Sequence, residues 1–143
     1  MTNFIPLSED FQVAPQISLT DIEVAKSLGV TLLISNRPDG EEPGQPNAAA
    51  FSAACQKAGI DFIHIPVGPA GISEKHLDDF QDATARSKGN VLAFCRSGTR
   101  STILRAFALA RAGRDIDEVI NEAASAGYNI SGQRTALEML SQT

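Results

Sequence analysis

The residues best suited to chemistry lie together in the segment CRSGTRS, residues 95–101. Cys95 supplies a thiol, Arg100 supplies a guanidinium, and Gly98 permits a backbone conformation that other residues avoid. The segment lies between the apolar run NVLAF and a helical pattern. Its backbone N–H groups are therefore expected to converge on one point at a helix N-terminus, which is a geometry that binds anions.

A thiol at the focus of those N–H dipoles, beside Arg96 and Arg100, is favoured as the thiolate. A thiolate is the nucleophilic form and can attack a sulfur or phosphorus centre. Arg100 can add a bidentate grip on a tetrahedral oxyanion. A reading of Cys95 as a small buried hydrophobe explains the cysteine but not the pattern around it. The predicted anion-binding loop also includes Arg96, Ser97, Gly98, Thr99 and Ser101.

The elements that must position this loop alternate along the chain. Apolar runs rich in β-branched residues are typical of strands covered on both faces. Three such runs predict strands: VTLLIS at 30–35, IDFIHIPV at 60–67 and NVLAF at 90–94. Helical patterns lie at 20–28, in AAAFSAACQKAG, at 73–87, in TILRAFALARAG, and in the final DIDEVINEAASAG and SGQRTALEMLSQ. Asn47 is expected to cap the second of these helices. The alternation predicts an α/β fold whose central, mostly parallel sheet is flanked by helices.

Ligands of such sheets bind at the carboxyl ends of the strands. The loops after Ser35, Val67 and Phe94 are therefore expected to meet there. The stretch 4–17 contains Pro6 and Pro15, which favours a short edge strand or hairpin over a central strand. A chain of 143 residues with 43% hydrophobic residues can bury one core but not two, so a single domain over 1–143 is expected.

Composition narrows the classes of partner and compartment. The formal net charge of −5 argues against non-specific binding to nucleic acid or to an anionic membrane. No apolar stretch of the sequence is long enough for a membrane span, and the N-terminus lacks the basic segment followed by an apolar segment that is typical of a signal peptide. A cytoplasmic location is therefore expected. Two cysteines and two histidines show no metal-site spacing, so neither a metal nor a cofactor is expected. Cys55, on an alanine-rich helix, is interpreted as a core residue, and His64, within FIHIPV, as a hydrogen-bonded strand histidine and not a ligand.

From FQVAPQIS through LLISNRPDGEEPGQP and FIHIPV to the cysteine loop, the sequence resembles the phosphatase-like domain of the beta-lactamase-hydrolase-like family. That resemblance implies the fold of the dual-specificity cysteine phosphatases. In some relatives the domain is fused to a persulfide dioxygenase of the metallo-β-lactamase type, which the resemblance makes a candidate partner. The loop CRSGTRS also resembles the active-site loop of rhodaneses, which carry sulfur as a cysteine persulfide.

Three departures from the phosphatase pattern favour sulfur chemistry. The Cys95 to Arg100 spacing is one residue shorter than the phosphatase C-x5-R loop, Phe94 replaces the usual histidine, and VGPAGIS lacks the usual acidic residue. The main hypothesis is therefore a sulfurtransferase that acts through a Cys95 persulfide on a small anionic or persulfide substrate. The alternatives are a phosphatase that forms a phosphocysteine at Cys95, and a non-catalytic anion or persulfide sensor.

The phosphatase alternative needs a general acid, and Asp39 in NRPDGEEPG is the leading candidate. Its loop leaves the carboxyl end of a strand and could extend over Cys95. The competing interpretation is that Asp39 and Gly40 form an ordinary turn and that Arg37 is a surface charge. Arg105, one turn beyond Ser101, is interpreted as a surface charge on its helix.

Overall fold

The computed structural model describes residues 3–142 and contains a five-stranded sheet in the order β1-β2-β5-β3-β4. A hairpin opens the chain, with β1 (Ile5–Ser8) antiparallel to β2 (Phe11–Ala14). The predicted hairpin is confirmed, but β2 is not an edge strand, because it also pairs in parallel with β5 (Asn90–Phe94). Pro6 has no N–H to donate to a neighbouring strand. It lies in β1, which is an edge strand of the sheet and has a partner on one side only.

The other strands are parallel, as predicted. β3 (Val30–Ser35) pairs with β5 on one side and with β4 (Asp61–His64) on the other. β4 is shorter than the predicted 60–67, because its ladder ends at the pairing of Ser35 with His64. Beyond that point the chain stays hydrogen-bonded to the β3 exit, since the Ile65 N–H donates to the Ser35 carbonyl.

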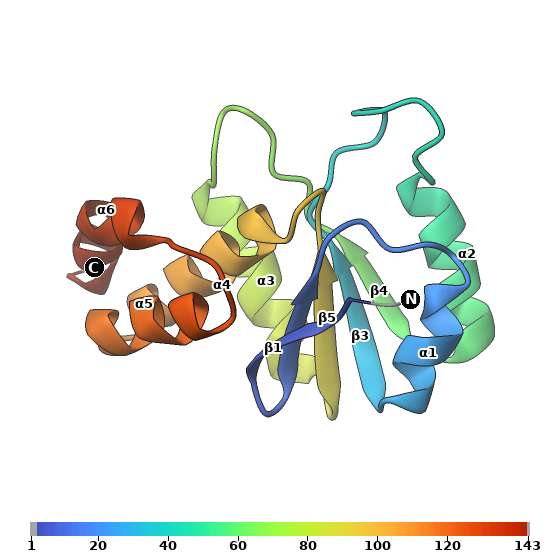
Figure 1. Cartoon of the computed structure of the whole chain (residues 1–143), viewed down its shortest axis with the longest axis horizontal. Helices are drawn as coiled ribbons and strands as arrows, with labels where there is room; N and C mark the ends of the chain where they lie inside the picture. The colour runs from blue at the N-terminus through green and yellow to red at the C-terminus, as the bar shows by residue number, and fades with distance from the viewer. Residues whose placement is uncertain (1–2, 143) are drawn as a thin grey trace.

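Helices cover both faces of the sheet (Figure 1). One face packs on α1 (Asp21–Ser27) and α2 (Ala48–Ala58), and the other packs on α3 (Glu74–Arg86) and α4 (Thr99–Arg111). Alternate residues of the strands supply the two cores, so that Ile34 faces α3 and α4 while Leu33 faces α1 and α2. The predicted cap of α2 is confirmed, since Asn47 accepts a hydrogen bond from the Ala50 N–H.

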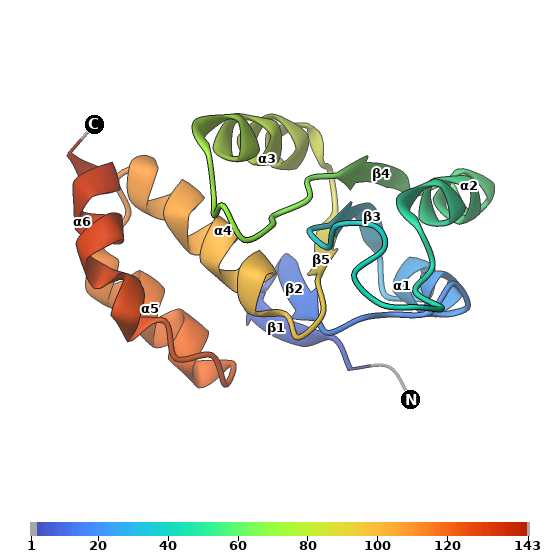
Figure 2. The ribbon, with the colours of Figure 1, turned by 90° about the horizontal axis from the view of Figure 1, so that it is seen from above.

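The chain ends in α5 (Ile116–Ser125), a 3₁₀ turn η1 (Ser131–Gln133) and α6 (Arg134–Ser141). These elements pack mainly on the side of α4 away from the sheet, as seen from above in Figure 2, and α5 also contacts the edge strand β1. A third apolar cluster holds them there, built from alanines of α4 together with Val119, Ile120 and Leu137. Within residues 3–142, no helix is both long enough and apolar enough to cross a membrane.

The loops after β3, β4 and β5 rise at the same end of the sheet, and Asn36 joins them (Figure 1). Asn36 is fully buried and follows β3 directly. Its main-chain N–H donates to the Phe94 carbonyl at 2.8 Å, and its side-chain amide donates to the Ile65 carbonyl at 3.0 Å. Its side-chain oxygen accepts from the Ser101 hydroxyl at 2.7 Å, and its carbonyl accepts from the Val67 N–H. One residue, through its main chain and its side chain, therefore ties together the three loops expected to hold the ligand.

Replacing Asn36 with leucine tests this role. Asn36→Leu keeps the branched shape of the side chain but removes the bonds of the side-chain amide to the Ser101 hydroxyl and the Ile65 carbonyl, so the unfolding free energy should fall by about 2–5 kcal/mol. Urea denaturation measures the loss. The matched control is Asn121→Leu at an exposed position of α5, which should change stability by less than about 0.5 kcal/mol. Equal effects at both positions would contradict the role assigned to Asn36.

Candidate active site

Cys95 lies at the base of the loop between β5 and α4, with none of its surface exposed. The Gly98 N–H donates to its Sγ at 3.0 Å. Gly98 is the N-cap of α4 and has a φ of 92°, a left-handed conformation that favours glycine. The Thr99 N–H donates to the Ser97 hydroxyl at 3.4 Å, while glycine at the N-cap supplies no side chain to occupy the other first-turn N–H groups, which can bind an anion. The predicted nucleophile and anion loop are thus brought together at the carboxyl end of β5.

Tyr128, from the turn after α5, packs against the same loop. Its hydroxyl donates to the Ser97 carbonyl at 3.0 Å, and a Cβ at Gly98 would collide with its ring and hydroxyl. Gly98 is therefore required both by its backbone conformation and by this close approach. Burial raises the pKa of Tyr128, and the charge of the nearby Cys95 raises it further, so the phenol stays protonated and keeps donating.

Arg100 extends from the first turn of α4 toward the loops after β3 and β4. Its guanidinium donates to the Val67 carbonyl at 2.9 Å and to both carboxylate oxygens of Glu41, at 2.8 and 2.9 Å. These bonds to Glu41, together with attraction to Cys95, raise the pKa of Arg100. The fork of Arg100 therefore lies within reach of the thiol and already holds a two-oxygen anion in bidentate geometry.

Glu41 also bridges to Arg37. Arg37 Nε donates to Glu41 at 2.9 Å, and Arg37 Nη1 donates to Gln16 at 2.8 Å. Arg37 is only 3% exposed, so its interpretation as a surface charge is wrong: paired carboxylates satisfy it inside the loop. Hydrogen bonds from Arg100, and then those from Arg37, lower the pKa of Glu41 from 4.5 to about 2.

Glu42 bridges Arg37 and Arg96 at the mouth of the site. It accepts from Arg37 Nη2 at 2.5 Å and pairs with Arg96 Nε at 3.2 Å. The Arg96 side chain is 69% exposed and lies on the rim, so its contribution is a screened surface charge. We name the five residues Arg37, Glu41, Glu42, Arg96 and Arg100 the rim network.

Asp39, the predicted acid, holds the loop to α2. Its carboxylate accepts from the Ala48 N–H at 2.8 Å, at the N-terminus of that helix, and the residue is exposed. The neighbouring Gly40 has a φ of 79°, which fits the turn expected there. The structure thus places Glu41, rather than Asp39, against Arg100.

The hydroxyl groups of the loop divide into two sets. Ser97 and Thr99 are exposed and bond to each other at 3.0 Å. Ser101 is fully buried and donates to Asn36. The side chains of the loop therefore face away from the thiol or brace it, so its polar lining toward an anion comes from main-chain N–H groups and Arg100.

Cys55 and His64 have the structural roles predicted for them. Cys55 is fully buried in the α1/α2 core, where burial raises the pKa of its thiol to about 11 and leaves it a poor nucleophile. The His64 ring bonds to the Arg37 carbonyl at 2.8 Å. In the part of the chain that the structure describes, no three His, Cys, Asp or Glu side chains are grouped to hold a metal ion.

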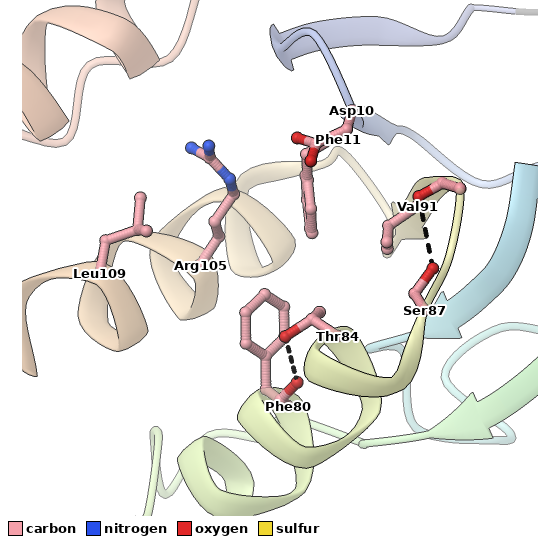
Figure 3. Close-up of a pocket in the computed structure, with 9 residues that line it drawn as sticks. Asp10, Phe11, Phe80, Thr84, Ser87, Val91, Arg105 and Leu109 are labelled. Atoms are coloured by element: carbon pink, nitrogen blue, oxygen red, sulfur yellow. Dashed lines mark hydrogen bonds between the residues drawn. The ribbon is translucent and has the colours of Figure 1, made fainter. Parts of the chain in front are cut away.

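Arg105 is not the surface charge that was expected. It is 8% exposed, pairs with Glu122 of α5 at 2.5 Å, and lies over the Phe11 ring at 5.0 Å. It borders a cavity of about 210 Å³ that also includes Phe80 (Figure 3). Since Phe11 pairs with Val91 at the amino ends of their strands, this cavity lies at the opposite end of the sheet from Cys95.

Asn36, Glu41, Glu42 and Tyr128 belong to the site but were missed from the sequence. Asn36 directly follows a buried strand, so its position at the carboxyl end of the sheet was a usable signal. Glu41 shared the NRPDGEEPG loop with Asp39, but nothing local distinguished the two carboxylates. Tyr128 had no local signal, because it is 31 positions from the residue it contacts.

Comparisons with known proteins agree with this geometry. Residues 3–113 match the family model of the beta-lactamase hydrolase-like protein, phosphatase-like domain. A beta-lactamase hydrolase-like protein of Xylella fastidiosa (strain 9a5c) is 39% identical over 111 residues, which cover 77% of this chain and 26% of that protein. The chain thus spans about a quarter of the length of that relative.

Solved structures extend the likeness to the whole chain. A candidate phosphatase of Neisseria meningitidis has a TM-score of 0.82 and 34% identity, over 95% of this chain and 96% of that one. Kinase-associated phosphatase, solved with its catalytic-site cysteine replaced by serine, has a TM-score of 0.77 at 18% identity, over 99% and 94% of the two chains. The latter likeness shows a shared fold. With a family match over residues 3–113, this α/β chain belongs to the phosphatase-like domain family of the beta-lactamase hydrolase-like proteins.

Proposed function

We propose that this domain is a phosphomonoesterase in which Cys95 is the nucleophile and Arg100 holds the phosphoryl oxygens. The observation that carries the proposal is the bidentate grip of Arg100 on the Glu41 carboxylate beside the thiol. A carboxylate and a phosphoryl group both offer two oxygens to one guanidinium fork. The Neisseria relative, itself a candidate phosphatase at 34% identity, supports the same assignment.

The reaction proceeds in two displacements. The Cys95 thiolate attacks phosphorus, the bond to the ester oxygen breaks, and the alcohol leaves with that electron pair and takes up a proton. Water then attacks the phosphocysteine, the phosphorus–sulfur bond breaks, and the thiolate returns as phosphate departs. Throughout, the α4 N-terminus and Arg100 stabilise charge on the phosphoryl oxygens, after the phosphoryl group displaces Glu41 from Arg100.

The source of the proton for the leaving group determines which esters react. Glu41, with its pKa near 2, is ionised at neutral pH and cannot donate while Arg100 holds it. Asp39 remains the proposed acid, and it must first exchange its bond with the Ala48 N–H. Esters whose alcohol leaves without protonation are therefore the substrates least dependent on Asp39.

The same lack of a poised acid supports a second candidate function, sulfur transfer through a Cys95 persulfide. Here the Cys95 thiolate attacks the sulfane sulfur of a donor such as thiosulfate, and sulfite leaves with the electron pair. An acceptor thiolate then attacks the persulfide and regenerates Cys95. Neither step needs a proton donor of the kind an alkyl ester requires. A persulfide dioxygenase is the partner proposed for this reaction.

Replacement of the nucleophile tests the primary proposal. Cys95→Ser should lower hydrolysis of p-nitrophenyl phosphate by at least about 1,000-fold, as for deletion of other catalytic nucleophiles. Acid quenching of the wild type during turnover should trap phosphate on the peptide that contains Cys95. The control Cys55→Ala, in the core on the other face of the sheet, should keep the activity. Unchanged turnover in Cys95→Ser would contradict the proposal.

Removal of the charge on Glu41 tests the competition for Arg100. Glu41→Gln should make inorganic phosphate a competitive inhibitor about tenfold tighter than with the wild type, equivalent to about 1.4 kcal/mol. Glu42→Gln is the matched control, because Glu42 pairs with Arg37 and Arg96 but not with Arg100. Weaker inhibition in Glu41→Gln would mean that Glu41 positions Arg100 instead of competing for it.

The same substitution has a pH signature in stability. The pKa of Glu41 is lowered from 4.5 to about 2 by folding, so its ion pairs contribute stability above pH 4.5 and lose it as pH falls toward 2. The stability difference between wild type and Glu41→Gln should shrink over that window in urea titrations.

Mass spectrometry separates the two chemistries. If the domain is a sulfurtransferase, incubation with thiosulfate should add one sulfur atom to Cys95, and cyanide should remove it as thiocyanate. If it is a phosphatase, aryl phosphates should turn over and the persulfide should be absent. Asp39→Asn should slow alkyl phosphates more than p-nitrophenyl phosphate if Asp39 is the acid. Fast thiosulfate turnover with no release of phosphate would contradict the phosphatase proposal and support sulfur transfer.

A further inference from the structure

An apolar groove leads away from Arg100 along α4. One cavity of about 310 Å³ begins at Val67 and Arg100, and a second cavity of about 310 Å³ reaches Met139 on α6. Both cavities are lined by Ile72 and Phe107. Because they share these side chains, we treat them as two halves of one groove, here named the α4 groove.

The walls of the α4 groove come from segments on either side of that helix. In Figure 2, α4 lies between α3 and the α5–α6 pair, and the segment from β4 to α3 runs beside it. That segment supplies Ile72, while α4 supplies Ile103 and Phe107. The far half is closed by Leu77 of α3 and by the α6 face that carries Met139. The groove is therefore apolar along its length.

Few charged side chains line the groove. Among the described residues that line it, Arg100 is the charged residue of the first half and Glu74 is that of the second half. Arg100 belongs to the site and binds an anion there. Glu74, at the start of α3, would repel an anion in the second half. A ligand that fills the groove thus has a single anionic head and an uncharged apolar tail.

We propose that the α4 groove binds the leaving group of the substrate, and that the substrates are small phosphate monoesters with an apolar alkyl or arylalkyl chain. The proposal rests on the proposed phosphatase function and specifies its substrate class. With the phosphoryl group beside Cys95 and Arg100, the chain of such an ester enters the groove at Val67 and passes Ile72 toward Met139. Burial of each methylene should increase kcat/KM about fourfold until the groove is full.

A series of n-alkyl phosphates from ethyl to decyl, each below its micelle concentration, tests the proposal by kcat/KM. Two variants place a charge at different depths: Ile72→Asp where the halves meet, and Met139→Glu at the far end. Met139 is 66% exposed, so its substitution leaves the core intact. Ile72→Asp should reduce kcat/KM for medium and long chains, and Met139→Glu for long chains only. For each variant, the kcat/KM of the longer esters is compared with that of ethyl phosphate on the same variant, so that the ratio reports binding of the chain.

Two controls separate the groove from a general effect of added charge. Met139→Leu keeps an apolar wall and should retain the dependence on chain length. Leu28→Glu adds the same charge at a half-exposed position beside α1, on the other face of the sheet, and should also behave as the wild type. A chain-length dependence lost in Leu28→Glu would overturn the proposal, because the dependence would then not come from the groove.

Calorimetric binding of n-alkyl phosphonates, which cannot be hydrolysed, distinguishes failure of the groove from failure of the proposed function. Affinity that rises with chain length, without hydrolysis of any ester, would support the groove and contradict the phosphatase. Affinity and turnover that do not change with chain length would overturn the groove and leave the phosphatase intact. A kcat/KM for phosphotyrosine peptides above that for every alkyl phosphate would also overturn it, as would absence of phosphonate binding.

Discussion

The hydrogen bonds of the buried Asn36 are the interaction on which the rest of the site depends. Parallel pairing brings the exits of β3, β4 and β5 to one end of the sheet, but it does not hold the loops beyond them. Asn36 bonds to Phe94 and Ile65, and to Ser101 in the first turns of α4. Since every polar group of Asn36 is used, the loops share one rigid anchor beneath the thiol.

The rim network determines how an anion can enter. Two glutamates balance three arginines there, and one of the arginines, Arg37, is buried. Without the glutamates, Arg37 would be an uncompensated buried charge of the kind that destabilises a fold by several kcal/mol. The same carboxylates hold Arg100 in place before an anion arrives. In the proposed reaction, entry of a phosphoryl group is therefore an exchange of one anion for another at Arg100, while Glu41 can keep its bond to Arg37.

Phosphorus and sulfur chemistry share the thiolate and its loop, and they differ in what the leaving group needs. The phosphatase-like family and the Neisseria relative favour phosphoryl transfer. Asp39, the proposed proton donor for an alkyl ester, is hydrogen-bonded at the N-terminus of α2 and not at the thiol. The chemistry of the domain thus depends less on the nucleophile than on the loop after β3, whose carboxylates lie at the entrance of the site.

The sequence by itself determined the α/β class, the parallel strands and the Cys95 loop, because these follow from patterns local to the chain. A buried strand, a glycine with positive φ and a helix N-terminus occur within a dozen residues, so their geometry is set by nearest neighbours. The same locality predicted the Asn47 cap and the core position of Cys55.

Only the tertiary structure decided which polar side chains meet. Arg37 and Arg105 look like surface charges in the sequence, and both are buried in the fold. Arg37 pairs with Glu41 and Glu42 of its own loop, and Arg105 pairs with Glu122 of another helix. Glu41 reaches Arg100 across 59 positions of chain, and Tyr128 reaches Ser97 across 31. Periodicity reports which face of an element is apolar, but the partner of a long polar side chain depends on how separate elements pack. That packing is a property of the whole fold, and no local pattern encodes it.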